Sequence, residues 1–259
     1  MANYFFLISA FPPLKFGVRP LLSFKEVREM LPLNLTDKDM LAVRRLLRPL
    51  DLYNLRALWL EAPLNEEGNF NAKDLEDSLL QKGIIPTFLS DFLDRYDSTA
   101  ERLHNFPSLY ASLYREMSDL KGFLAKYYQF EREVRLILTA LRCKTVGRDP
   151  IVELQFEDPT EFFIADILAQ KESPDYVPPK EYEDLKTFFL DNTYDPRKLQ
   201  QAILQYRFNK IEEMEDSQDF SIDRVLAYLA RLLIVEESTE LDDYKSQGMV
   251  VVGNLSQYG

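Results

Sequence analysis

One stretch, from Pro107 to Gly147, constrains the fold more than any other part of the chain. Its apolar residues recur at alternating steps of three and four, the spacing that places side chains on one face of an α-helix: Leu120, Phe123, Tyr127, Phe130, Val134, Ile137 and Leu141. Pro107 suits the first position of a helix, and Gly147 suits the position just past its end. Without a break the helix would be about 60 Å long at 1.5 Å per residue, so we expect a kink between Ser118 and Gly122. The pattern predicts a long helix at the centre of the molecule.

The same helix carries charged residues close to its apolar face. Glu131 precedes Arg135 by four residues, which is the favourable order for an ion pair along a helix. Because buried charges need partners, we predict that Glu131 and Arg135 form a structural ion pair between packed helices. Glu116 falls among the apolar positions of the same helix. Glu116 and Glu131 could therefore be the acid and base of a carboxylate-based enzyme, and this alternative stays open.

Helix-start signals recur along the rest of the chain. Capping boxes are predicted at Ser23 with Glu26 and at Ser98 with Glu101. The segment IDRVLAYLARLLIVEES has apolar residues on more than one face, which predicts burial on two sides. A short apolar stretch, IVELQF, could be a strand or simply extended. With only 8 glycines in 259 residues, an all-β fold rich in tight turns is disfavoured, and we expect one all-α domain spanning residues 1–259.

The cysteine and apolar content place limits on the cellular environment. A single cysteine, Cys143, cannot form an internal disulfide, so we expect a reducing compartment, the cytoplasm, and a buried thiol that packs as a small apolar side chain. The N-terminal run MANYFFLISAFPP has no basic region and is too short to span a bilayer. We therefore predict that this run belongs to the core and that no segment inserts directly into a membrane.

Charge is distributed unevenly along the chain. The net charge is −12, yet residues 1–50 contain eight basic and four acidic residues, so the remainder carries −16. An acidic body repels nucleic acid, which we exclude as a direct ligand. Arg44, Arg45 and Arg48 form the densest positive cluster and could bind an acidic partner, although they could also serve only to stabilise the end of a helix. An acidic run around Glu212 to Asp219 is interpreted as a solvated loop or a docking patch.

Sequence motifs for catalysis and cofactor binding are missing from the chain. It has one histidine, and it contains no G-x-S-x-G, C-x-x-C or H-E-x-x-H motif. Gly248 and Gly253 have the glycine spacing of a phosphate-binding loop, but the lysine that would reach the phosphates does not follow them. These absences disfavour most hydrolase, zinc and redox designs. We expect a protein that is not an enzyme and has no cofactor, metal ion or small-molecule substrate.

Several segments resemble one family. The stretch DLYNLRALWLEAPLNEEGNFNAKDLEDSLLQKGIIPTFLSDFL resembles the repeat unit of the V-type ATP synthase C subunit, the counterpart of the eukaryotic d subunit. The stretch FEREVRLILTALRCKTVGRD is similar to a second copy, in which Glu131 takes the place of Asp51 and Val134 that of Asn54. The segment RVLAYLARLLIVEE resembles the C-terminal helix of the family. The start, NYFFLISAFPPL, is similar to a bacterial branch of uncharacterised proteins found in V-type ATPase operons.

This resemblance implies a function as well as a fold. It implies a pseudo-repeated, funnel-like helical protein on the cytoplasmic face of the inner membrane, peripheral to it through partner subunits. There it would be a non-catalytic member of the central stalk that connects the axle subunits, D and F, to the proteolipid ring and so serves ion transport. We expect lobes at residues 1–105, 106–195 and 196–259, and we expect Asp51, Asn54, Glu131 and Arg135 to bond helix to helix. A general helical scaffold protein is an alternative.

Overall fold

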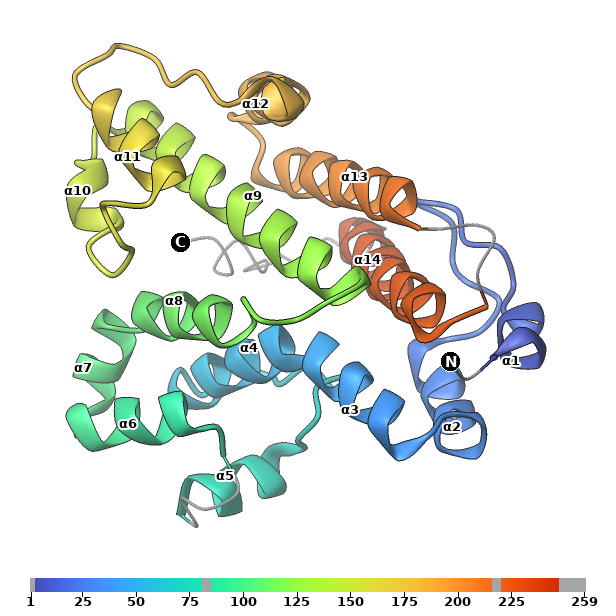
Figure 1. Cartoon of the computed structure of the whole chain (residues 1–259). Helices are drawn as coiled ribbons and strands as arrows, with labels where there is room; N and C mark the ends of the chain where they lie inside the picture. The colour runs from blue at the N-terminus through green and yellow to red at the C-terminus, as the bar shows by residue number, and fades with distance from the viewer. Residues whose placement is uncertain (1–2, 81–84, 216–219, 247–259) are drawn as a thin grey trace. The chain divides into compact units, whose positions relative to one another are not determined.

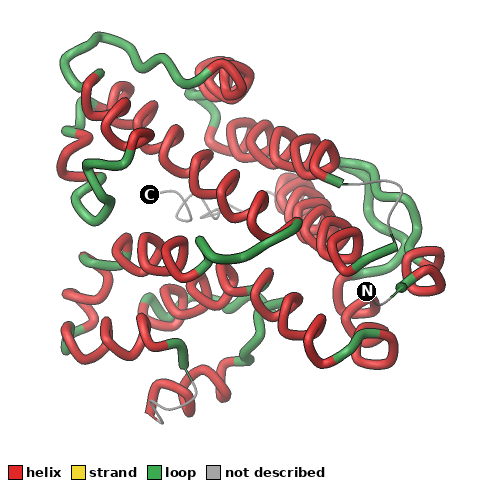
Figure 2. Tube along the Cα trace, in the orientation of Figure 1, coloured by secondary structure: helices red, strands yellow, loops and turns green. Residues whose placement is uncertain are grey.

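The computed structural model describes residues 3–80, 85–215 and 220–246, and all the regular structure in these ranges is helical (Figures 1 and 2). The prediction of an all-α fold is confirmed. The chain forms two compact units: unit 1 comprises Met1–Thr36 and Lys121–Gly259, and unit 2 comprises Asp37–Leu120. Unit 2 is therefore inserted into the sequence of unit 1. The lobes predicted at residues 1–105, 106–195 and 196–259 are a different division of the chain and stay a prediction.

Unit 2 is built from short helices. They are α3 (Asp37–Leu46), α4 (Arg48–Trp59), α5 (Ala72–Leu80), α6 (Thr87–Arg95), α7 (Thr99–His104) and α8 (Pro107–Glu116). Helix α4 packs against α3, α7 and α8, and α6 packs against α8. The predicted capping box at the start of α7 is present, since the Ser98 hydroxyl accepts from the Glu101 N–H while the Glu101 side chain accepts from the Ser98 N–H.

A group of aromatic rings packs within unit 2. The Trp59 ring stacks on Phe92, with centroids 6.0 Å apart, and meets Phe106 edge to face at 6.1 Å. The guanidinium of Arg102 lies over Trp59, 5.7 Å from its ring centroid, and that of Arg56 lies over Phe106 at 6.0 Å. Such ring and cation–π contacts add about 0.5–1.5 kcal/mol each to the burial of the rings. These rings pack together with the fully buried leucines of unit 2, among them Leu55 and Leu113.

Unit 1 contains the three longest described helices, α9 (Phe123–Val146), α13 (Pro196–Met214) and α14 (Ile222–Ser246), together with shorter ones. The shorter ones are α1 (Phe5–Ala10), α2 (Phe24–Asn34), α10 (Pro150–Glu153), α11 (Phe162–Ala169) and α12 (Glu183–Asn192), with a 3-10 turn at Lys180–Tyr182. Helices α13 and α14 pack along each other, and α12 packs on α13 (Figure 1). Helix α2 rests on α14, and its predicted capping box between Ser23 and Glu26 is present. The core of unit 1 therefore lies among α9, α13 and α14.

Helix α9 is the central element that the periodicity predicted. It contacts α10, α11, α12, α13 and α14. The predicted apolar face is buried from Phe123 to Leu141, with Val134 and Ile137 completely inaccessible to solvent, whereas Leu120 precedes the helix and is half-buried. Leu136 and Leu138, which lie off that face, are buried too, because neighbouring helices cover α9 on several sides.

Helix α14 is buried on two sides, as its sequence predicts. Every residue from Val225 to Leu232 is buried, a run that covers more than one helix face. Its neighbours are α13, α9 and α2. At this depth charged residues must be paired, and Arg231 lies within the buried run.

The predicted long helix is divided into α8 and α9, which belong to different units. Helix α8 ends at Glu116, and α9 begins after Gly122, a glycine with a φ of 65°. The Asp223 carboxylate of α14 accepts a hydrogen bond from the Phe123 N–H at 3.0 Å. A Cβ at position 122 would lie 2.4 Å from Asp223 Oδ2. The expected kink is therefore a complete break, which a contact distant in the sequence holds in place.

One predicted extended segment is helical instead. The first residues of IVELQF belong to the short helix α10, and the N–H of Ile151 donates to the Asp149 carboxylate at 2.9 Å. Pro150 at the first helical position suits this start, because its missing N–H would have had no partner within the helix. The expectation of a strand or an extended segment is wrong for these first residues, because local capping outweighs the β-branched composition.

The N-terminal run packs partly into the core. Tyr4, Leu7 and Ile8 are buried, as predicted, whereas Phe6 is 86% exposed. The Tyr4 N–H donates to the Phe220 carbonyl at 2.8 Å, just before α14. This contact places the following residues, from Ile8 to Leu14, alongside α13 and α14.

Candidate functional site: a pocket beside helices α13 and α14

Asp51 and Asn54, which were predicted to bond helix to helix, hold the turn that follows their own helix. Asp51 accepts hydrogen bonds from the N–H and the side-chain amide of Asn69, both at 2.7 Å. Asn54, which is 1% exposed, donates to the Asn65 carbonyl at 2.8 Å and accepts from its N–H at 2.7 Å. A Cβ on Gly68 would come within 2.7 Å of the Asn54 amide. The turn needs these bonds because its backbone groups have no helical or strand partners.

The three arginines predicted to bind a partner differ in exposure. Arg44 is exposed, whereas Arg45 and Arg48 are half-buried. The Nη1 atom of Arg48 is buried. Arg44 is thus the member of the cluster that a partner could reach most easily. Partner binding by these residues stays a prediction.

Glu131 and Arg135 are both buried, and each has its ion-pair partner on a different element. Glu131 Oε1 on α9 accepts from Nε and Nη2 of Arg207 on α13, at 3.0 and 2.9 Å. Arg135 donates to Glu157, in the loop between α10 and α11. The predicted ion pair along α9 is therefore replaced by two pairs that link α9 to other elements.

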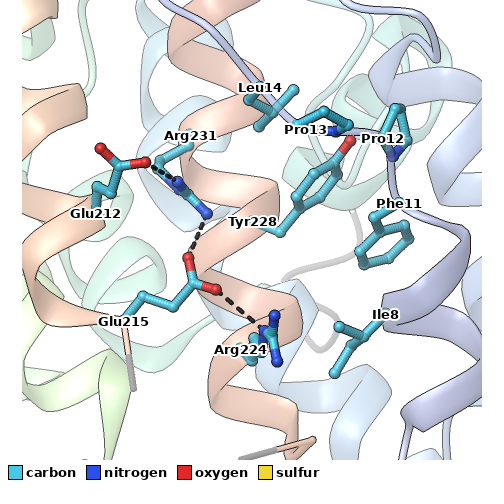
Figure 3. A pocket seen from close by; sticks show the side chains of 10 residues that line it. All are labelled: Ile8, Phe11, Pro12, Pro13, Leu14, Glu212, Glu215, Arg224, Tyr228 and Arg231. Carbon is cyan, nitrogen blue, oxygen red and sulfur yellow. Dashed lines mark hydrogen bonds and ion pairs between the residues drawn. The ribbon is translucent and has the colours of Figure 1, made fainter. Parts of the chain in front are cut away.

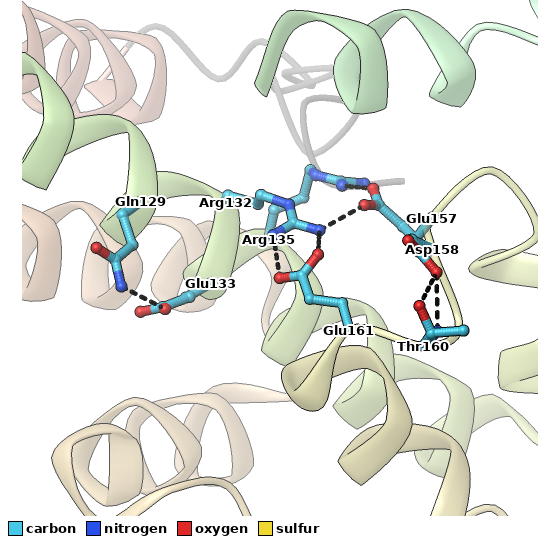
Figure 4. Close-up of polar contacts among 8 residues, drawn as sticks. All are labelled: Gln129, Arg132, Glu133, Arg135, Glu157, Asp158, Thr160 and Glu161. Atoms are coloured by element: carbon cyan, nitrogen blue, oxygen red, sulfur yellow. Dashed lines mark hydrogen bonds and ion pairs between the residues drawn. The ribbon is translucent and has the colours of Figure 1, made fainter. Parts of the chain in front are cut away.

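Arg135 belongs to a larger ion-pair cluster on this side of unit 1 (Figure 4). Arg132 binds Glu161 through two bonds of 2.6 and 2.7 Å, and it reaches Glu157 at 2.9 Å. Burial alone would raise the pKa of Glu157, but the charges of Arg135 and Arg132 outweigh it and hold that pKa below the ordinary 4.5. The cluster holds the loop that precedes α11 against helix α9, and its role is therefore structural.

The surroundings of the other candidate residues do not favour acid–base catalysis. Glu116 is an exposed side chain at the end of α8. Glu131 is buried and is bound by Arg207. Cys143 is buried, as predicted, and burial raises the pKa of its thiol to about 11. Among the described residues, no group of histidine, cysteine, aspartate and glutamate side chains is arranged to hold a metal ion.

A pocket of about 460 Å³ opens in unit 1, between the N-terminal segment and helices α13 and α14 (Figure 3). One wall is apolar and comes from the N-terminal segment: Ile8, Phe11, Pro12, Pro13 and Leu14. The opposite wall is polar and comes from the end of α13 and the first half of α14: Glu212, Glu215, Arg224, Tyr228 and Arg231. The lining is thus divided about equally between apolar and polar side chains.

The charged residues of the pocket neutralise one another. Arg231 donates to Glu212 at 2.8 Å and also to Glu215, and Arg224 donates to Glu215 at 3.1 Å. The Arg231 guanidinium also lies over the Phe208 ring, 5.8 Å from its centroid. The polar wall is therefore a chain of ion pairs that runs from α13 to α14 and carries no net charge.

Tyr228 belongs to the polar wall and contacts the apolar wall through its ring. Its ring stacks on Phe11, with centroids 4.3 Å apart and planes 14° from parallel. The side chain is 7% exposed, and its hydroxyl group is buried without a hydrogen-bond partner. Burial raises the pKa of Tyr228 to about 12, so the hydroxyl keeps its proton at neutral pH. The pocket thus contains a buried O–H group that is able to donate.

This pocket does not follow from the sequence alone. The sequence predicts that the N-terminal run lies in the core and that the acidic run is a solvated loop or a docking patch. Of the acidic run, Glu212 and Glu215 line the pocket, while Asp216 and Asp219 lie outside the described residues. Signals that could have indicated the pocket are the Pro12–Pro13 pair and the spacing of Arg224 and Arg231, seven residues apart on one helix face.

None of the described helices is long and apolar enough to cross a membrane.

Comparison with known proteins identifies the family. The family model "Protein of unknown function (DUF2764)" matches residues 1–254. An uncharacterized protein of Chlamydia muridarum is 30% identical over 100% of this chain and 99% of its own length. Similar relatives occur in Chlamydia trachomatis, at 29% identity over 100% of this chain and 99% of its own length, and in Chlamydia pneumoniae, at 28% over 89% of each chain. No solved structure matches.

These findings correct the resemblance inferred from the sequence. Neither the matching family nor these relatives carry the name of a V-type ATPase component, so the assignment to the V-type ATP synthase C subunit family is wrong. The segments that suggested it are short helical patterns, and amphipathic helices of unrelated proteins share such patterns because they meet the same packing demands. The family model covers nearly the whole chain, and the protein belongs to the DUF2764 family.

Proposed function

We propose that this protein is a non-catalytic helical adaptor that binds a partner protein through the pocket lined by the Ile8–Leu14 segment, α13 and α14. The observation that carries the proposal is the combination of an apolar wall with a polar wall whose charges are already paired. This function agrees with the general helical scaffold that the sequence leaves open as an alternative.

The chemistry of the pocket favours binding over catalysis. A general acid or base needs a titratable group that is free to exchange a proton with a substrate. Here the Glu215 carboxylate is bound by both Arg224 and Arg231, and Glu212 is bound by Arg231. Bonds from arginine stabilise the ionised carboxylate and so weaken it as a proton acceptor.

The apolar wall supplies the attraction that binding needs. Burying apolar surface contributes about 25 cal/mol per Å². Pro12 and Pro13 also limit the conformations of the segment that forms this wall, so little freedom is lost when a partner binds. A preformed wall of this kind suits a protein surface.

The central-stalk role came only from the resemblance to the V-type ATP synthase family. It stays a prediction, together with its partners, the axle subunits D and F and the proteolipid ring, and the proposed function does not depend on it.

The test is site-specific photo-crosslinking in the native organism. Pro13 is exposed at the edge of the pocket, and a photoreactive phenylalanine analogue placed there should crosslink to one defined protein. The matched control is Tyr194, which is 99% exposed after α12, outside the pocket lining. A crosslinked protein found at Pro13 and not at Tyr194 supports the proposal. No adduct at Pro13, or the same adducts at both positions, contradicts it.

A further inference from the structure

Two hydrogen-bond donors on the polar wall of the pocket are unsatisfied. The Tyr228 hydroxyl and the Arg231 Nε atom are both buried, and neither has a hydrogen-bond partner. Both residues are more than nine-tenths buried. Burying a polar group without a hydrogen bond costs roughly 1–3 kcal/mol, so native proteins seldom leave such groups unmatched. In Figure 3 the Tyr228 hydroxyl points away from its own helix, toward Pro13.

The type of these groups indicates what the missing partner must offer. The Nε–H of an arginine can only donate a hydrogen bond, and a protonated tyrosine can donate one. The complementary group is therefore an acceptor. The acceptor does not need to be charged, because the arginines and glutamates of this wall already neutralise one another. A neutral acceptor such as an amide carbonyl meets both conditions.

The apolar wall adds a further requirement. The ligand must pack against the stacked rings of Phe11 and Tyr228 and must bring few N–H groups of its own, because the paired carboxylates leave few acceptors for them. Proline in an extended peptide has these properties: it has no N–H, it keeps its carbonyl, and its ring packs on aromatic side chains. The pocket volume, about 460 Å³, falls within the range of ligand-binding pockets.

We propose that the pocket binds a proline-containing, extended segment of the partner protein, whose backbone carbonyls accept hydrogen bonds from the Tyr228 hydroxyl and the Arg231 Nε–H. The proline rings pack against Phe11 and the neighbouring prolines. This inference rests on the proposed adaptor function and names the kind of segment that the adaptor recognises.

The experiment measures binding of acetylated, amidated tetraproline to the full-length protein by NMR, with isotope-labelled tyrosine rings as reporters. The Tyr228 signals should shift on titration, and Tyr228→Phe should weaken the affinity about five- to tenfold through the loss of one hydrogen bond. The matched control is Tyr176→Phe. Tyr176 is also buried with an unpartnered hydroxyl but lies outside the pocket lining, so its variant should bind like the parent.

Further peptides and one further variant make the test decisive. Acetylated, amidated tetra-alanine should bind much more weakly than tetraproline, and tetraproline with a free carboxylate should bind no better than the amide. Phe11→Leu should weaken binding without removing either donor, which provides a second variant if Tyr228→Phe does not fold. The inference is overturned if tetraproline does not bind the folded parent, if tetra-alanine binds equally well, if the free carboxylate binds more tightly, or if Tyr228→Phe binds like the parent.

The two proposals fail in different ways. A crosslinked partner at Pro13 without tetraproline binding would remove only the proline inference. Tetraproline binding without any crosslinked partner at Pro13 would remove the adaptor function.

Discussion

Buried charges in unit 1 depend on partners that lie far away in the sequence. Glu131 and Arg207 are 8% and 9% exposed at their side chains, and the ion pair between them links α9 to α13. Taking a carboxylate out of water costs several kcal/mol unless an opposite charge and hydrogen bonds compensate. Removing either Glu131 or Arg207 alone is therefore expected to destabilise the protein.

The first prediction concerns this ion pair. Arg207→Met should lower the free energy of unfolding by about 3–5 kcal/mol, because it leaves the Glu131 carboxylate buried without its arginine. Adding Glu131→Leu to that variant should recover a large part of the loss, since no uncompensated charge then remains. Urea denaturation of the parent, both single variants and the double variant measures the coupling. Additive losses would mean that the two residues act independently.

The second prediction concerns Glu157, whose pKa is lowered in the folded protein. Burial opposes this lowering, and the charges of Arg135 and Arg132 outweigh the burial. A lowered folded-state pKa stabilises the protein fully above the unfolded value of 4.5, and this stabilisation is lost as pH falls through the folded-state pKa. Glu157→Gln should therefore be about 3 kcal/mol less stable than the parent at pH 7, and this difference should shrink in acid.

Denaturation curves measured from neutral pH down to about pH 3 test this pH dependence. Glu172→Gln is the control, because that side chain is 89% exposed and its loss should change little at any pH. A stability difference between the Glu157→Gln variant and the parent that stays constant with pH would contradict the assignment.

At the scale of helices, the point where α9 begins depends on one glycine and one aspartate. Gly122 has a positive φ, and its Cα faces the Asp223 carboxylate at the start of α14. Gly147, at the other end of α9, also has a positive φ, of 70°, but a Cβ there would meet nothing within 4 Å. The two glycines also differ in ψ, which is −144° at Gly122 and 32° at Gly147. Gly122 therefore combines a backbone conformation that is open almost only to glycine with a steric conflict.

The third prediction uses this contrast. Gly147→Ala should cost roughly 1–2 kcal/mol, the strain of a left-handed backbone at a residue with a Cβ. Gly122→Ala should cost at least about 1 kcal/mol more, because its backbone conformation is open almost only to glycine and because the methyl group pushes Asp223 away from the Phe123 N–H that it caps. Thermal and urea unfolding of both variants gives the comparison. Equal losses would contradict both the greater backbone strain at Gly122 and the contribution of the Asp223 contact.

The sequence predicted those helices whose signals are local. The capping boxes at Ser23 and Ser98, the apolar face of α9 and the two-sided burial of α14 all depend on residues a few positions apart. The break at Gly122 could be placed only approximately, because it depends on Asp223, a hundred residues away. The partners of Glu131 and the pocket were missed for the same reason, since periodicity gives the face of a helix and not its neighbour.

At the scale of the molecule, unit 2 is a continuous segment and unit 1 is not. Unit 2 has its own aromatic core and its own contacts among α3, α4, α6, α7 and α8. The helices of unit 1 likewise pack on one another, with α13 and α14 as the central pair. Each unit therefore has the internal packing that independent folding requires.

The fourth prediction follows from this division. Replacing residues 37–120 by a flexible glycine–serine linker of roughly 10 residues should leave unit 1 helical by circular dichroism, with a cooperative melting transition. Residues 37–120 expressed alone should also be helical. Tetraproline binding by the linker variant provides a functional control, because the pocket lies entirely in unit 1. Loss of cooperative melting would show that the two units stabilise each other.

The Asp223 cap also bears on the order in which the protein acquires structure during synthesis. Unit 2 is complete once residue 120 has left the ribosome, so its helices can pack while the rest of the chain is still being translated. The hydrogen bond that caps the first turn of α9 can form only after another hundred residues have been added, when Asp223 is available. The bond from the Tyr4 N–H likewise requires Phe220. Unit 1 therefore completes its packing last, once the residues around Phe220 and Asp223 have been synthesised and can contact Tyr4 and the start of α9.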